Sequence, residues 1–187
     1  MTTQVVQIPG YVVGKWTIDP VHSDVSFLAK HMMVSKVRGR FDKFEGTFTT
    51  APDPLQSSVA ATVDLSSVNT GEPNRDNHIR SADFFEVESH PTLTFHSTGV
   101  RPDGDNFLLD GDLTIRGTTR PVTLKLEVNG FGPDAYGGTR AGFSASGEIN
   151  RNDFGVSYNG PIPGGGVAVS EKVTITLEIE GVLDKAE

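Results

Sequence analysis

The 187-residue sequence contains no cysteine, which excludes disulfides, thiolate metal ligands and cysteine nucleophiles. It also lacks any apolar run close to the roughly 20 residues that span a bilayer, so we expect no integral membrane segment. Its first residues, MTTQVVQIPG, have neither the basic stretch nor the long apolar core of a secretory signal. We therefore expect a soluble, cytoplasmic protein.

Positive charge is also scarce in this chain. It has 16 Lys and Arg against 24 Asp and Glu, a formal net charge of -8, and a pI near 5.1. Nucleic acid and anionic membrane surfaces both attract proteins through dense groups of Lys and Arg. The overall charge therefore predicts no nucleic-acid partner and argues against a polybasic, membrane-surface protein.

Alternation of apolar and polar residues is the dominant pattern in the chain. In 173–180, VTITLEIE, the apolar side chains share one face and the Thr and Glu side chains share the other, as in a half-buried strand. The Gly, Pro, Asn and Asp residues between such segments predict an antiparallel order. The other expected strands lie at 16–19, 22–29, 40–50, 58–65, 92–100, 107–115, 121–128 and 141–150.

Helical signals are few and short. The segment 31–38 is compatible with two helical turns, and 73–85 with a short helix capped by Asn74. Neither helix is long enough to cover a sheet, so the sheet must bury its apolar face against itself. This predicts an all-β fold, a closed antiparallel barrel of about eight strands with one or two short helices in the connections. A barrel of that size has room for one small ligand.

Motifs for catalysis and metal binding are missing. The five His residues form no H-E-x-x-H or H-x-H pattern, and no Gly-rich phosphate-binding loop occurs. The segment 142–147, GFSASG, differs from a nucleophile elbow because its second Gly is one position late and it lies in an expected strand. We predict no catalytic residue, no resident metal and no cofactor. A metal-dependent enzyme that uses His from several strands remains the alternative hypothesis.

Five segments, taken in order, resemble the YceI-like family: 16–32, 39–48, 74–95, 111–124 and 149–155. The resemblance implies a lipocalin-like barrel at 16–184, preceded by an N-terminal extension at 1–15. It further implies a non-catalytic protein that binds, sequesters or transports a long-chain isoprenoid or quinone-like lipid. Many family members are periplasmic, and this chain differs from them in its first residues. By family analogy we also expect a homodimer, with 5–13 in the contact, and a role in stress adaptation.

A lipid tunnel would be lined by the inward residues of the strands, joined by two Phe residues at one barrel end. Small inward residues such as Gly111 and Gly147 are expected to keep the tunnel open. The predicted tunnel residues are Val25, Phe27, Phe44, Phe48, Val63, Phe84, Phe85, Leu93, Phe95, Leu109, Leu113, Phe143, Ile175 and Leu177. A polar head group needs donors at the mouth, and the candidates are His22, Arg38, His78 and Arg151.

Overall fold

The structure, a computed structural model, describes residues 6–160 and 168–185. The strands are β1 (Gly14–Ile18), β2 (Asp24–His31), β3 (Ser35–Phe41), β4 (Phe44–Thr50), β5 (Ser58–Asp64), β6 (Val68–Asn69), β7 (Thr92–Asp103), β8 (Asn106–Ile115), β9 (Thr118–Pro133), β10 (Thr139–Asn150) and β11 (Lys172–Leu183). The helices are α1 (Pro73–Arg80) and the 3-10 turns η1 (Pro54–Gln56), η2 (Leu65–Ser67) and η3 (Arg151–Phe154).

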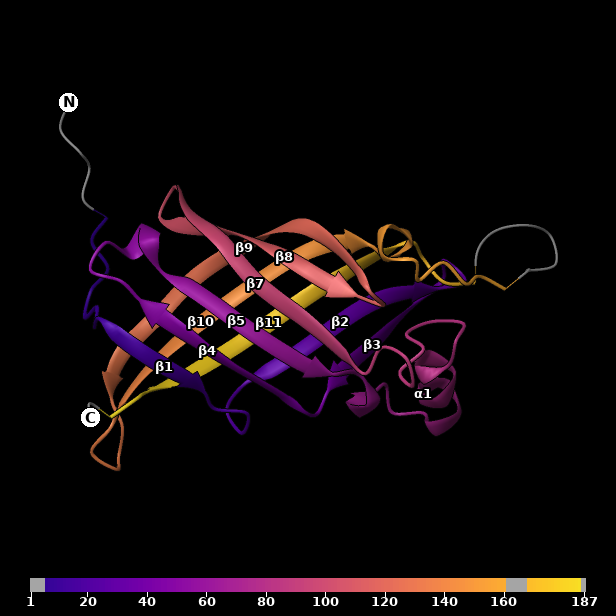
Figure 1. The fold of residues 1–187 in the computed structure, drawn as a ribbon, viewed down its shortest axis with the longest axis horizontal. Coiled ribbons are helices and arrows are strands. Elements are labelled where there is room, and N and C mark those ends of the chain that lie inside the picture. The colour runs from indigo at the N-terminus through magenta and orange to yellow at the C-terminus, as the bar shows by residue number, and fades with distance from the viewer. Residues whose placement is uncertain (1–5, 161–167, 186–187) are drawn as a thin grey trace.

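Eight of these strands close into an antiparallel barrel in the order β1-β4-β5-β7-β8-β9-β10-β11, because β11 pairs back with β1 (Figure 1). The barrel is elongated, and its two ends differ. We call the end that carries α1, η3 and the β2–β3 turn the helix end, and the end that carries residues 6–13 the N-terminal end. The fold class predicted from the alternation is confirmed.

The β2–β3 hairpin lengthens the barrel at the helix end. β1 pairs with the last residues of β11, whereas β2 pairs with its earlier part, from Thr174 to Glu178. β3 then pairs with β2 and, at its far end, with the short β6. The connection between β6 and β7, which contains α1, packs Ile79, Phe85 and Val87 against this part of the wall.

Two local predictions were wrong. Helix α1 is capped by Glu72, whose carboxylate accepts the backbone N–H groups of Asn74 and Arg75, so Asn74 lies inside the helix. The segment 31–38, expected to be helical, forms the turn and first half of the β2–β3 hairpin. Pairing of β2 with β11 and β3 outweighs the weak local helix propensity of that segment.

A buried aromatic group closes the N-terminal end. The indole of Trp16 is fully buried, donates to the Thr50 hydroxyl at 2.8 Å, and stacks on Phe48 with a centroid separation of 5.7 Å. Phe131 and Phe143 complete the group, and Val12 from the N-terminal extension packs against it. Residues 6–13 thus contribute to this barrel end; Val5, the first residue of the segment expected in a dimer contact, lies outside the described residues.

Among the described residues, no helix has the length and apolar character required to cross a membrane.

Candidate functional site

The barrel encloses an apolar cavity of about 390 Å³, a size typical of small-molecule sites. Its wall runs from Ile8, Tyr11 and Phe131 at the N-terminal end to Phe84 and Phe154 at the helix end. Inward side chains of the strands form the middle of the wall. The cavity is therefore a direct consequence of the alternation along closed strands.

All the residues predicted to line a tunnel lie on this wall: Val25, Phe27, Phe44, Phe48, Val63, Phe84, Phe85, Leu93, Phe95, Leu109, Leu113, Phe143, Ile175 and Leu177. The inward residues of β11 keep part of their surface accessible although they stand in the middle of the sheet. That free surface faces the cavity and is available to an apolar ligand. Contact between these residues and a lipid remains a prediction.

The sequence analysis missed lining residues that lie outside regular strands. Ile8 and Tyr11 come from the N-terminal extension, and Phe154, Val156 and Val169 come from the segments around η3. Periodicity gives no signal in such segments. The Tyr11 hydroxyl donates to the Ala51 carbonyl at 2.6 Å, a long-range contact that holds the extension across the barrel end.

Inward glycines do not leave the expected empty space. A side chain at Gly111 would collide with the ring of Phe95, and one at Gly147 would lie 2.7 Å from a methyl carbon of Leu124. The ring of Phe27 covers Gly39 in the same way. These glycines allow large side chains to lie flat along the wall instead of projecting across the cavity, which is how the centre remains open.

Polar lining residues differ between the two ends. At the N-terminal end the polar groups are uncharged hydroxyls, from Tyr11, Thr49, Thr50, Ser57 and Ser58. Toward the helix end the lining includes basic residues, which are Lys30, His31, Arg75, His78 and Arg151, although the side chain of Lys30 alternates to the outer face of β2. None of the described lining residues is Asp or Glu. The cavity therefore has an electrically neutral end and a basic end.

Arg151 is a buried part of the wall at the basic end. It is 5% exposed, and its guanidinium donates to the carbonyls of Ser170, Val156, Tyr158 and Val169 at 2.7–3.2 Å. Burial lowers the pKa of this guanidinium. Four of its five N–H groups are thus committed to the main chain, so its principal role is to hold the η3 segment to the chain before β11.

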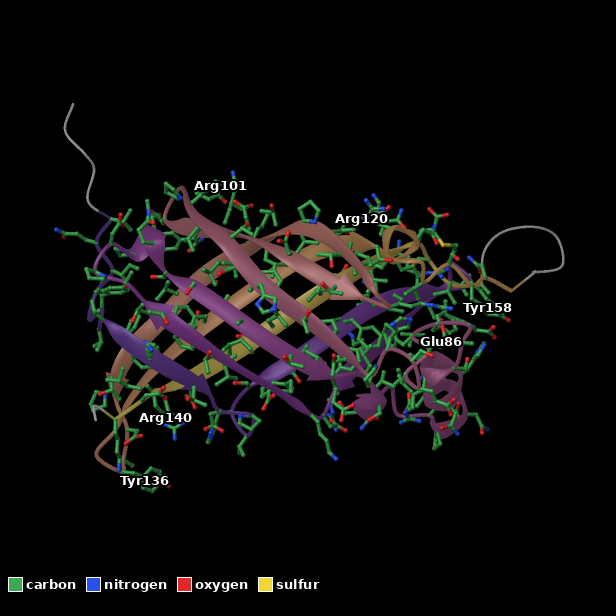
Figure 2. All side chains as sticks on the ribbon, viewed as in Figure 1. Glu86, Arg101, Arg120, Tyr136, Arg140 and Tyr158 are labelled. Carbon is green, nitrogen blue, oxygen red and sulfur yellow. The ribbon has the colours of Figure 1, made fainter. Side chains whose placement is uncertain are left out.

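His78 is the second head-group candidate on the cavity wall. Its Nε2 lies 2.8 Å from a carboxylate oxygen of Asp83, and its ring packs edge-on against Phe84 and Tyr158. Tyr158 is at the helix end in Figure 2. The ring is half exposed, so a polar group of a ligand at this end of the cavity can reach it.

The other two head-group candidates lie away from the cavity. Arg38 is exposed on the outer face of β3. His22 is exposed in the β1–β2 connection, where its Nδ1 is 2.8 Å from Asp19 and 3.5 Å from Glu180. The structure therefore does not bring His22 or Arg38 to the lining, and their contact with a head group stays a prediction.

The metal-enzyme hypothesis needs His from several strands to converge. Among the described residues, the one group of three possible metal ligands is Asp19, His22 and Glu180, which contains a single His. The guanidinium of Arg140 donates to both carboxylates, at 2.8 and 2.9 Å. This group is an ion-pair network in which a cation is already supplied by the chain, and it gives the hypothesis no support.

The same network predicts acid-sensitive stability. Hydrogen bonds from Arg140 and then His22 hold the pKa of Asp19 far below its usual range. A carboxyl with a lowered pKa stabilises the fold above its unfolded pKa, about 3.9 for Asp, and loses that contribution as pH falls further. In urea denaturation we expect the free energy of unfolding to decrease below about pH 4, and Asp19→Asn to flatten that decrease.

The control for this prediction is Asp105→Asn, at an exposed position in the β7–β8 turn. It should leave the pH dependence of stability close to that of the unmodified protein. An Asp19→Asn variant whose stability falls with acid as steeply as that of the parent chain would contradict the prediction.

The fold and cavity define a class of protein: a closed antiparallel barrel built around an internal apolar cavity. A YceI-like domain model matches residues 16–181, and the chain belongs to this family. It is 40% identical over 166 residues to Protein YceI of Escherichia coli O157:H7, covering 88% of this chain and 83% of that protein. It is 39% identical over 163 residues to a UPF0312 protein of Pseudomonas aeruginosa strain LESB58, covering 86% of this chain and 82% of that protein.

Solved structures of other proteins have the same barrel fold. The chain resembles BcnA of Burkholderia cenocepacia with a TM-score of 0.76 and 25% identity, over 87% of this chain and 98% of BcnA. For the Campylobacter jejuni YCEI protein the TM-score is 0.72 and the identity is 27%, over 83% of this chain and 90% of that protein. A polyisoprenoid binding domain from Saccharophagus degradans has a TM-score of 0.68 and 17% identity, over 92% of this chain and 100% of that domain. This similarity concerns the fold alone.

Proposed function

We propose that this protein holds one amphiphilic lipid with a long apolar chain, such as a polyisoprenoid or a quinone-like molecule, inside the barrel. The observation that carries the proposal is the cavity inside the barrel, whose middle is lined by Val, Leu, Ile, Phe and Ala side chains. The name of the Saccharophagus degradans domain, a polyisoprenoid binding domain of the same fold, supports this ligand class.

The energetics favour a chain-like ligand. Each buried CH₂ group contributes about 0.8 kcal/mol, so about 15 buried carbons contribute roughly 12 kcal/mol. Part of this gain offsets the lost freedom of the ligand. The Phe side chains that lie flat over Gly111 and Gly39 belong to the folded wall already, so little further ordering of the protein is needed on binding.

The head group of the lipid binds, in this proposal, at the basic end of the cavity. Arg75 and His78 line this end, and both are exposed. A guanidinium is a strong donor to phosphate and carboxylate oxygens. We therefore propose an acidic head group at the helix end and the apolar chain directed toward Tyr11 at the N-terminal end.

Binding of this kind requires no chemical conversion of the ligand. The ionisable side chains on the described wall are Tyr11 and the basic residues at the helix end, and no carboxylate lies among them as a general base. The Asp83 carboxylate contacts His78 but is not itself a lining residue. The proposed activity is therefore sequestration or transport of the lipid.

Native mass spectrometry followed by solvent extraction tests this function. Protein purified without detergent should show a discrete mass excess that extracts as an isoprenoid or quinone-like lipid. Leu177→Trp, at a half-buried inward position between Ala145 and Val25, should reduce lipid loading at least tenfold because the indole fills the centre of the cavity.

The matched control is Thr176→Trp, which adds the same side chain at an exposed position one residue away on the outer face of β11. It should load lipid as the parent chain does. The proposal fails if the purified parent chain carries no lipid and takes up none from added polyprenyl phosphate, or if a folded Leu177→Trp variant loads lipid fully.

A further inference from the structure

The turn of the β2–β3 hairpin exposes three consecutive apolar side chains. The exposed fractions are 47% for Met32, 57% for Met33 and 85% for Val34. The turn is tight, since the Val34 N–H donates to the His31 carbonyl at 3.1 Å. Single exposed apolar residues are ordinary on a protein surface, but a contiguous run at a projecting tip marks an interaction site.

The backbone of this turn is strained. Met32 has φ = 50° and Met33 has φ = 59°, the left-handed region that disfavours residues with a side chain. A β-turn with positive φ at both central residues prefers Asn-Gly at those two positions. The chain instead places two long, flexible apolar side chains there. Strain that a Gly would relieve is a feature associated with functional sites.

The strands that carry the turn are basic on their outer face. Residues 25–41 contain four of the 16 Lys and Arg in the chain and none of the 24 Asp and Glu. The register places Lys30 directly opposite Lys36, and Leu28 opposite Arg38, on the face that points away from the barrel interior. Like charges in direct cross-strand contact are destabilising, so this pairing is a second local cost.

The tip lies beside the basic end of the cavity. His31, immediately before the turn, lines the cavity and forms a bridge with Val169, and the Met32 N–H donates to the Ala168 carbonyl at 2.9 Å. Figure 1 shows the β2–β3 turn projecting at the same end as α1. A surface that bound the tip would therefore face the end at which we place the head group.

We propose that the β2–β3 hairpin docks the protein on an anionic phospholipid bilayer. Met32, Met33 and Val34 enter the boundary between head groups and acyl chains, and Lys30, Lys36 and Arg38 contact the lipid phosphates. Apolar side chains flanked by Lys and Arg are the combination that binds membrane interfaces. The overall charge of -8 obscured this local basic surface in the sequence analysis.

A bilayer fits this tip better than a protein partner does. Specific protein interfaces bury about 1,000 Å² or more with a well-packed centre, and a three-residue tip supplies a small part of that. A fluid bilayer needs no matching pocket, and its phosphates complement the basic strands. Docking does not depend on a ligand in the cavity, so this inference and the proposed function can fail separately.

Vesicle co-sedimentation tests the inference. The parent chain should sediment with vesicles of phosphatidylglycerol and phosphatidylcholine, and its binding should fall with added salt and be weak on phosphatidylcholine alone. The double substitution Met32→Asn with Met33→Gly places residues that tolerate positive φ at the two strained positions, so folding is protected. It should lower the partition coefficient at least tenfold, and Lys36→Glu should lower it several-fold while creating a favourable cross-strand pair with Lys30.

The matched control is Tyr136→Ser, which removes an 89% exposed aromatic side chain from the opposite barrel end, where Figure 2 places Tyr136. It should bind vesicles as the parent chain does. The inference is overturned if the parent chain stays in the supernatant, as expected for a hairpin that docks on a protein. It is also overturned if the double variant binds like the parent, or if Tyr136→Ser reduces binding equally. Native mass spectrometry of the double variant should show unchanged lipid loading.

Discussion

Trp16→Ala is expected to lower the free energy of unfolding by about 3–5 kcal/mol, the range for removal of a large aromatic side chain from a core. The Trp16 indole is fully buried, and it contacts Phe48 and Phe131 at centroid separations of 5.7 Å. Its N–H also donates a hydrogen bond to the Thr50 hydroxyl, which itself donates to the Val12 carbonyl at 2.7 Å. The substitution therefore opens a cavity and disturbs a hydrogen-bonded chain at the barrel closure.

Urea denaturation followed by circular dichroism measures this loss, because Trp16 is the single Trp of the chain and fluorescence is lost with it. Trp16→Phe should cost less than Trp16→Ala, since the ring keeps much of the packing while the hydrogen bond to Thr50 is lost. Tyr136→Ala, at an exposed position, should change stability by less than about 0.5 kcal/mol. A Trp16→Ala variant within about 1 kcal/mol of the parent chain would contradict the assigned role in barrel closure.

The second large effect is expected at Arg151. Arg151→Met keeps an unbranched side chain but removes four hydrogen bonds to main-chain carbonyls in a buried environment. A hydrogen bond to a charged group contributes about 1.5–3 kcal/mol, and an orphaned buried acceptor carries its own penalty. Since these contributions are not additive, we expect a loss of about 3–5 kcal/mol in the free energy of unfolding, again measured by urea denaturation.

Hydrogen exchange localises the effect of Arg151→Met. Protection should fall around Val156 and Ser170, the segments that the guanidinium joins. Arg151→Lys should recover part of the stability, because an ammonium has three donors and lacks the planar fork that reaches several carbonyls. Arg38→Met, on the exposed outer face of β3, is the control and should leave stability within about 0.5 kcal/mol.

These measurements also separate two roles of Arg151. If the role of Arg151 is purely structural, Arg151→Met should be less stable than the parent chain, and its lipid loading should fall only to the extent that the wall loses order. If Arg151→Met is as stable as the parent chain but loads at least tenfold less lipid, Arg151 is instead a head-group ligand, as the sequence analysis proposed. Its remaining N–H group and its place on the cavity wall make that outcome measurable.

The inward positions of the regular strands were predictable because side-chain direction has a period of two along a strand. Leu113 on β8 and Ile175 on β11 lie on the cavity wall as the alternation predicted. Closure of the barrel followed from the same pattern, since one apolar face without covering helices must be buried against itself. Tyr11 and Val156 were missed because irregular segments have no period.

The basic residues could not be placed from the sequence because each depends on contacts that are distant along the chain. Arg151 follows a strand, as a residue at the cavity mouth would, but the carbonyls that surround it belong to residues 156–158 and 169–170. Arg38 alternates outward because β3 pairs with β2, which the helical interpretation of 31–38 concealed. The basic outer surface of the hairpin was hidden by the same error.

The amino-acid sequence by itself determined the all-β class, the closed antiparallel barrel and the apolar faces that form the cavity, because these follow from local periodicity and from the need to bury one face of every strand. Only the tertiary structure decided that Phe95 lies flat over Gly111, that the basic groups of the cavity gather at one end, and that Met32 and Met33 project from a strained turn. Those features arise from contacts between distant segments, and no local pattern encodes them.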